Sequence, residues 1–362
     1  MNRSYEITPQ RIVSHEVFYV RKRQRISLSA ASIFLILIDP KTAIESAQSG
    51  LLLCIHTIVP TLFPLFFLSA ILTDSIADLR LCRFNGLCKF MGLPIGAESS
   101  FLLSLVGGYP VGTKTVHSLY NKGYIDISVA NRLMGFYNLA GPSFIFGFSA
   151  TLFEFSYAPW LVWGIQILSA ITVALILPHK KTVCSGNIHA NVMQSIPQIL
   201  GVSIKNIAMV CGWIVLFRIV IGYADTYILH YISNGASVLI TGFLELSNGT
   251  TALTSINNEA LRFVLFNVFL SFGGLCVIMQ IISAGQGIIS HAFFIGKGLH
   301  FLITLSLSLV IQRILRIPGY DSIPFLPILI SVFIVILISA MTYSKKRVAT
   351  EQYLLYNVIN NR

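Results

Sequence analysis

Charged residues are scarce in this sequence. Only 11% of its 362 residues are Asp, Glu, Lys or Arg, whereas 55% are hydrophobic. A water-soluble protein with so few charges would expose large apolar patches and aggregate. The composition therefore excludes a soluble globular protein and predicts a polytopic membrane protein.

Motifs for metal binding, disulfide frameworks and catalysis are also missing. The six cysteines include no C-x-x-C pair, and the eight histidines include no H-E-x-x-H pair. There is no nucleophile elbow and no pair of carboxylates at a useful spacing. We therefore expect no enzyme activity, no catalytic residue and no metal site. We also expect no cofactor, with coupling to H⁺ or Na⁺ left open.

The charge that is present is mostly positive, and its position is informative. The formal net charge is +11, and the basic residues cluster beside apolar runs. This placement is typical of cytoplasmic anchors that fix membrane topology, and it favours the lipid bilayer over nucleic acid as a partner. The main clusters are Arg3, Arg11, Arg21, Lys22, Arg23 and Arg25, then Lys180 and Lys181, and finally Lys345, Lys346 and Arg347.

Long apolar runs predict membrane-spanning helices, each about 17–25 residues long. The predicted spans are 51–73, 139–154, 158–177, 199–222, 262–283, 291–315 and 325–343. A shorter run, 26–38, is either a further span or the apolar part of a signal peptide. Counting it as a span keeps every basic cluster on the cytoplasmic side. The sequence therefore predicts a multi-pass protein of the cell membrane with about eight spans and with both termini in the cytoplasm.

These runs divide the chain into seven regions. The predicted order is a basic cytoplasmic arm (1–25), a first helix and loop (26–50), a first half (51–178), a cytoplasmic linker (179–198), a second half (199–320), a last helix (321–343) and a cytoplasmic tail (344–362).

Two further apolar segments, 98–122 and 235–255, are interrupted by Gly, Pro and polar residues. They occupy equivalent places in the two halves, because Gly107 precedes Gly141 by 34 residues and Gly242 precedes Gly274 by 32. The predicted topology gives the halves opposite orientations. The sequence thus predicts two re-entrant or broken helical hairpins in an inverted repeat, the plan of many secondary transporters. Low identity between the halves leaves coincidence as the alternative.

The segment GGYPVGTKT, residues 107–115, resembles a phosphate-binding P-loop. Thr113 stands where the lysine should be, however, and no soluble β-strand precedes the segment. Gly107 and Gly108 instead predict a tight turn, Tyr109 and Pro110 the start of a helix, and Gly112 a slim first turn. The stretch is interpreted as a hairpin tip.

The strongest single candidate for chemistry is Glu245, since a carboxylate within a membrane is a functional-site hypothesis by default. It either binds the solute or a coupling ion, or it caps a half-helix. Ser247, Asn248, Gly249 and Thr250 follow it and would complete a polar tip.

A break in the helix over 135–154 is predicted at Asn138, Gly141, Pro142 and Ser143, where Pro142 would kink the helix and expose carbonyls. Gln280 lies in the equivalent region of the second half. For these positions a plain kink or a packed polar side chain is the alternative.

The same residues resemble a known family. GGYPVGTK, LYNKGYI and NRLMGFYNLAGPSFIFG, followed by GFLELSNGTTAL and SFGGLCVIMQ, are similar to segments of the sporulation integral membrane proteins of the YlbJ type, over roughly residues 45–320. The resemblance implies a nucleoside recognition (Gate) domain, a fold related to concentrative nucleoside transporters, and a role in endospore formation. It is specific for the family and not for a substrate.

Two functions follow as hypotheses. The first is a transporter-like protein that moves a small polar solute through a midplane site between two opposed hairpins. The second is a non-transporting membrane scaffold or assembly factor for the spore envelope and its cortex. A homo-oligomer is left open.

Overall fold

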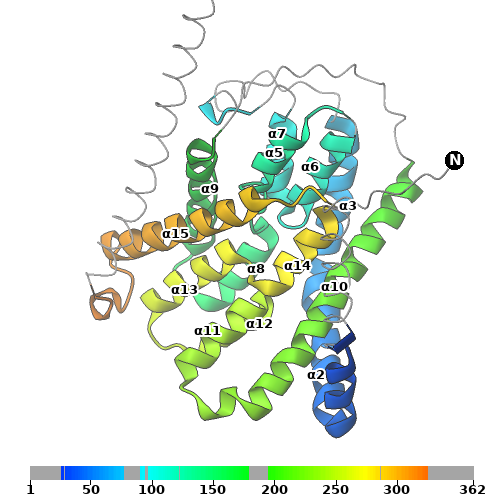
Figure 1. The fold of residues 1–362 in the computed structure, drawn as a ribbon. Coiled ribbons are helices and arrows are strands. Elements are labelled where there is room, and N and C mark those ends of the chain that lie inside the picture. Colours follow the sequence, from blue (N-terminus) through cyan, green and yellow to red (C-terminus); the bar gives the residue numbers. More distant parts are fainter. Residues whose placement is uncertain are drawn as a thin grey trace, which may run out of the picture.

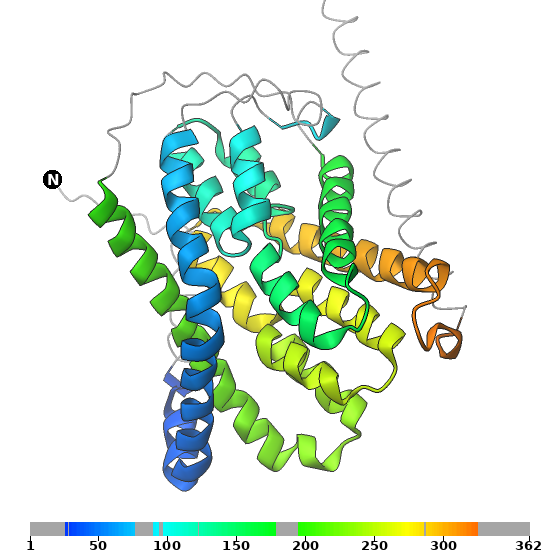
Figure 2. The same cartoon turned by 180° about the vertical axis from the view of Figure 1, so that it is seen from behind.

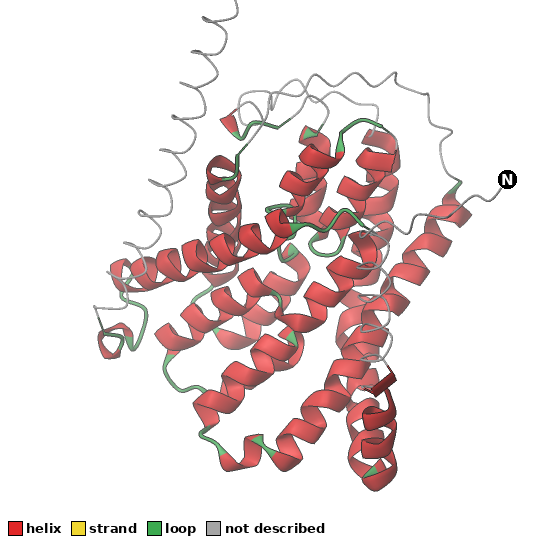
Figure 3. Ribbon diagram, in the orientation of Figure 1, coloured by secondary structure: helices red, strands yellow, loops and turns green. Residues whose placement is uncertain are grey.

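The computed structural model describes residues 26–27, 29–76, 90–93, 97–121, 123–178, 195–285 and 287–324. Within these ranges the chain is helical and contains no strand (Figure 3). Five helical stretches of these ranges are long and apolar enough to cross a membrane. They are Pro40–Leu68, Ala158–Ile176, Ile196–Tyr227, Glu259–Gly285 and His291–Ile314. The basic arm, the last predicted helix from residue 325 onward, the tail and linker residues 179–194 lie outside the described residues.

The first long rod consists of α2 (Pro40–Leu53), a π-helical turn η1 (Cys54–Ile58) and α3 (Val59–Ile76). A loop was expected before residue 51, but the chain is helical there from Pro40 onward. Asp39 caps the helix by accepting a hydrogen bond from the Thr42 amide at 3.1 Å, and Pro40 occupies the first helical turn. An Asp-Pro pair starts a helix because proline has no amide that needs a partner there. The apolar run 26–38 ends at this cap, with Ser29–Ile38 forming a short apolar helix.

The long helix α10 (Ile196–Tyr227) packs against this rod (Figures 1 and 2). Small residues allow the close approach, because a Cβ on Gly50 would lie 3.2 Å from the Val215 Cα and a Cβ on Gly222 would clash with Ser46. Leu, Ile and Met side chains of α10 are also exposed, as expected for a surface in lipid.

The first half continues with a helical hairpin. It is formed by α5 (Glu98–Gly107) and α6 (Val111–Asn121), which pack against each other. A broken pair, α7 (Ile127–Met134) and α8 (Pro142–Leu152), follows, and α9 (Ala158–Ile176) completes the half. The predicted span 139–154 is thus shorter than expected. Pro142 does not kink a helix but begins one, because Gly141 is extended and serves as the N-cap.

The second half has the same order of elements. After α10 and the short turn η3 (Leu229–Tyr231), α11 (Asn234–Leu244) and α12 (Leu246–Ala252) meet at Glu245, and η4 (Leu253–Ser255) follows. The apolar stretch predicted as the span 262–283 is divided into α13 (Glu259–Phe272) and α14 (Gly274–Gly285). The long α15 (His291–Ile314) crosses beside α9 and α13 and leads to η5 (Tyr320–Ser322) (Figure 1).

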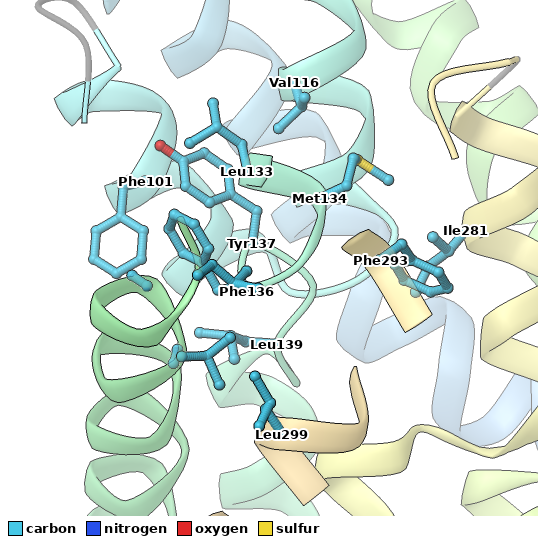
Figure 4. Packing of buried hydrophobic residues seen from close by; sticks show 14 of the residues in the cluster. Phe101, Val116, Leu133, Met134, Phe136, Tyr137, Leu139, Ile281, Phe293 and Leu299 are labelled. Carbon is cyan, nitrogen blue, oxygen red and sulfur yellow. The ribbon is translucent and has the colours of Figure 1, made fainter. Parts of the chain in front are cut away.

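An aromatic cluster anchors the first hairpin to α7 (Figure 4). The ring of Tyr137 lies 5.5 Å from that of Phe101 and 5.2 Å from that of Phe136, and all three side chains are buried. The Tyr137 hydroxyl donates to the Ala97 carbonyl at 3.0 Å. The hairpin is therefore held by packing as well as by its own turn.

A buried arginine replaces a hydrogen bond that proline removes. The Ala174 carbonyl in the last turn of α9 has Pro178 four residues on, and proline has no amide to donate. Arg132 supplies the donor, with its Nη2 atom at 2.7 Å from that oxygen, and it also donates to the carbonyls of Met91 and Gly92. One side chain thus ties α7 to the end of α9.

Replacing Arg132 with methionine is expected to lower the free energy of unfolding by about 2 kcal/mol, because three carbonyls lose their donor while the apolar volume is retained. Thermal denaturation of the detergent-solubilised protein measures the loss. Lys41→Met is the matched control, since the Lys41 side chain is 83% exposed and lies 3.9 Å from the Glu45 carboxylate at a helix surface. Equal melting temperatures for the two variants would contradict the prediction.

Candidate functional site

The tip of the first hairpin lies against the break between α7 and α8. The Tyr109 amide donates to the Leu139 carbonyl at 2.8 Å, and a Cβ on Gly108 would lie 2.6 Å from the Gly141 Cα. Gly112, in the first turn of α6, faces the Tyr137 carbonyl so closely that a side chain would clash with it. The predicted residues Gly107 and Pro110 flank this contact, at the end of α5 and just before α6.

Asn138 fixes the end of α7 to the hairpin. Its Nδ2 donates to the Met134 carbonyl at 3.0 Å, and its Oδ1 accepts a hydrogen bond from the Thr113 hydroxyl at 2.5 Å. Asn138 lies in the non-helical stretch between α7 and α8, and both ends of its side chain are used in positioning α6 against α7.

The second hairpin repeats this arrangement. A Cβ on Gly274 would lie 3.2 Å from the Leu246 amide and 3.3 Å from the Glu245 Cα, so the tip between α11 and α12 abuts the break between α13 and α14. The break itself is made by Gly273 and Gly274, with φ values of 83° and 74° that only glycine adopts readily. Gly249 packs directly on Gly242, which brings α12 against α11.

Glu245 caps the half-helix α12. Its carboxylate accepts hydrogen bonds from the Ser247 amide at 3.0 Å and from the Asn248 amide and side-chain Nδ2, both at 2.7 Å. Only 2% of the residue is exposed. This geometry is that of the capping alternative, and both carboxylate oxygens of Glu245 accept hydrogen bonds in it.

Lys297 of α15 joins the two breaks. Its Nζ donates to the carbonyl of Asn138 at 3.1 Å and to that of Ser271 at 3.0 Å. The ammonium also lies 5.5 Å from the centre of the Tyr109 ring. The two halves of the chain thus meet at one buried cation.

A cavity of about 380 Å³ opens beside these elements, between the π-helical turn η1, α3, α8 and α12. The rod of α2 and α3 lies beside α8 in Figure 2. The lining residues are Leu53, Thr57, Ile58, Thr61, Ser143, Phe144, Gly147, Phe148, Thr151, Thr250, Thr251 and Thr254. Single π-helical turns within α-helices are frequent at functional sites. Here such a turn, the start of a half-helix and a hairpin helix line the same space.

Hydroxyl groups supply the polar atoms of the side chains that line this cavity. Thr61, Thr151, Thr250, Thr251 and Thr254 each donate their hydroxyl hydrogen to a carbonyl three or four residues earlier. Their oxygen lone pairs remain available as acceptors. No charged side chain is among the lining residues. The cavity therefore suits a neutral occupant that offers hydrogen-bond donors and an apolar body.

The structure brings only part of the predicted site together at the cavity. Ser143 and Thr250 line it, whereas Gln280 lies on α14, where its Nε2 contacts the Cys276 Sγ at 3.4 Å. Sequence reasoning missed Lys297 and the threonines of the cavity other than Thr250. The signal for Lys297 was a lysine inside an apolar span, which is as strong a functional hint as Glu245. The scattered threonines gave no comparable pattern.

The described residues contain no cluster of three or more His, Cys, Asp or Glu side chains. The cysteines described are free.

Known proteins offer one informative comparison. No family model and no solved structure matches the chain. The chain is 25% identical to the sporulation integral membrane protein YlbJ of Bacillus subtilis (strain 168), over an alignment of 330 residues that covers 75% of this chain and 79% of the relative. Together with the apolar helices, this similarity supports the YlbJ-type resemblance and identifies the chain as a multi-pass integral membrane protein.

Proposed function

We propose that this chain is a transporter-like membrane protein that moves a small, neutral polar solute between its two halves and serves spore formation. The proposal includes an inverted repeat of about eight spans with both termini in the cytoplasm, and a Gate-like fold. The main support for the proposal is the cavity beside η1, α8 and α12. Irregular backbone at membrane depth persists only where protein buries it or where it lines a cavity, and here interrupted helices line a cavity.

The matched order of elements supports the repeat. Each half contains a long helix, a hairpin, a broken helix and a further long helix, and in each half the hairpin tip contacts the break that follows it. Secondary transporters place solute sites at such discontinuous helices. The sporulation link rests on the similarity to the YlbJ protein.

Gly147 provides a direct test. It lies on α8, lines the cavity, and has no atom within 4 Å of an added Cβ. Gly147→Leu is expected to fold normally but to fill the cavity, which should weaken solute affinity at least about tenfold, or about 1.4 kcal/mol. Gly164→Leu is the matched control, since Gly164 is equally open but lies on α9 away from the cavity.

Two measurements use this pair of variants. Thermal shifts are recorded with nucleosides, nucleobases, neutral amino acids and polyols, and spore yield is recorded in a host strain in which each variant replaces the native copy. A solute shift and a spore yield that survive in Gly164→Leu but not in Gly147→Leu would support transport. Wild-type spore yield in Gly147→Leu, with no solute shift in any protein, would reject it.

A non-transporting scaffold is the second candidate, favoured by Glu245. Its carboxylate is fully engaged in capping α12, so the strongest polar residue of the tip already has a structural role. A scaffold would tolerate a filled cavity, and the Gly147→Leu strain therefore separates the two functions.

A further inference from the structure

Lys297 is a buried lysine with an unusual set of partners. It is 6% exposed, and its ammonium contacts two backbone carbonyls and the face of one aromatic ring. Among the described residues, no carboxylate oxygen lies within 4.0 Å of its Nζ, since the ion pairs found there join other residues. A buried ammonium is costly unless something compensates it. The compensation here comes from backbone oxygens.

Both oxygens were left without a helical partner by the local sequence. In a continuous helix the Asn138 carbonyl would accept from residue 142, but that residue is Pro142 and has no amide. The Ser271 carbonyl would accept from residue 275, but Gly273 and Gly274 turn the chain out of the helical path first. The two breaks therefore each supply one unpaired acceptor, and these acceptors converge on one point.

Such a point is suited to a cation. Carbonyls at the C-terminal end of a half-helix carry partial negative charge, and Ser271 lies in the last turn of α13. Unwound carbonyls and half-helix C-termini are the groups that coordinate alkali ions in transporters with discontinuous helices. In this chain the ammonium of Lys297 already occupies the space between them. His300, three residues further along α15, lies beside the same Ser271 carbonyl, with its Nδ1 at 3.4 Å.

We propose that Lys297 acts as a built-in cation, which takes the place of a free alkali ion between the broken helices of the two halves. The side chain holds the ammonium at the junction, so the junction needs no Na⁺ or K⁺ from solution. This inference rests on the proposed function in one respect: it assigns any transport by this chain to a mechanism that does not require Na⁺.

The test removes the tethered ammonium and offers free cations instead. Wild-type protein and Lys297→Ala are heated in detergent with chloride salts of Na⁺, K⁺, methylammonium or choline at equal ionic strength. The wild-type melting temperature is expected to be the same in all four salts. Lys297→Ala is expected to melt lower in choline, which is too large for the site, and to regain at least about 3 °C in one of the smaller cations by mass action.

Two further variants separate charge from packing. Lys297→Met fills the space without charge, so its melting temperature is expected to be low and insensitive to the cation. Lys297→Arg keeps the charge, so it is expected to remain near the wild type and equally insensitive. If Lys297 had only a packing role, the melting temperature of Lys297→Ala would not rise with small cations, and the rise would not depend on the size of the cation.

Two outcomes would overturn the inference. One is a Lys297→Ala variant that is as stable as the wild type in choline or gains nothing from any small cation. The other is specific stabilisation of the wild type by Na⁺ over choline, a result that needs no variant to fold. These outcomes are distinct from failure of the transport proposal, which is decided by solutes and by Gly147→Leu in a fixed salt.

Discussion

Gly108→Ala is expected to lower the free energy of unfolding by about 3 kcal/mol or more. Two costs combine at this position. Gly108 has a φ of 66° and a ψ of −170°, a combination that is essentially restricted to glycine and costs other residues about 1–3 kcal/mol. An added Cβ would also lie 2.6 Å from the Gly141 Cα, and overpacking of this kind costs about 1–3 kcal/mol. Because the obstacle is backbone, no side-chain rotation can relieve it.

Three glycines separate these costs. Gly123 has a φ of 73° but nothing within 4 Å of an added Cβ, so Gly123→Ala measures the cost of a positive φ without a close contact. Gly141→Ala, whose nearest neighbour would be Gly108 at 3.3 Å and whose φ is −73°, measures the contact alone. Gly164→Ala lies in an open part of a helix and is expected to be neutral or slightly stabilising. Melting temperatures of the four purified variants give the order. A loss in Gly108→Ala no larger than that in Gly123→Ala would mean that the tip does not abut the break.

Glu245→Ala is expected to cost about 2–3 kcal/mol, because two backbone amides and one side-chain amide lose their acceptor inside the protein. Glu245→Asp should retain most of the stability, since aspartate is among the best N-cap residues. Glu245→Gln should be intermediate, because its amide keeps one acceptor oxygen but turns an NH₂ group toward the donors.

Glu154→Ala is the control for loss of a glutamate, since Glu154 is exposed. Thermal denaturation is read together with the solute shifts described above. If Glu245 instead serves the solute alone, Glu245→Ala would melt at the wild-type temperature and lose only the solute shift. That result would contradict the capping role.

The sequence predicted the helix breaks of the first half, because their causes are local. A run of two glycines followed by Tyr-Pro predicts a turn wherever it occurs, and the turn lies between α5 and α6. The break near Gly141 likewise has a local cause in Pro142, whereas the division of the predicted span 262–283 at Gly273 and Gly274 was missed. The helix boundaries were less accurate. The start of α2 at Pro40 was missed because its polar and small residues, which pack on α10, do not form an apolar run.

The sequence by itself determined that this protein is a helical membrane protein and where its helices are interrupted, since hydropathy, proline and glycine act on their immediate neighbours. Only the tertiary structure decided what completes the interrupted helices. Pro178 removes a donor, and Arg132 replaces it from 46 residues earlier in the chain; Pro142 and Gly273 each leave an acceptor, and Lys297 serves both. A local signal creates an unpaired backbone group, but its partner depends on which side chain the packing brings within hydrogen-bond distance.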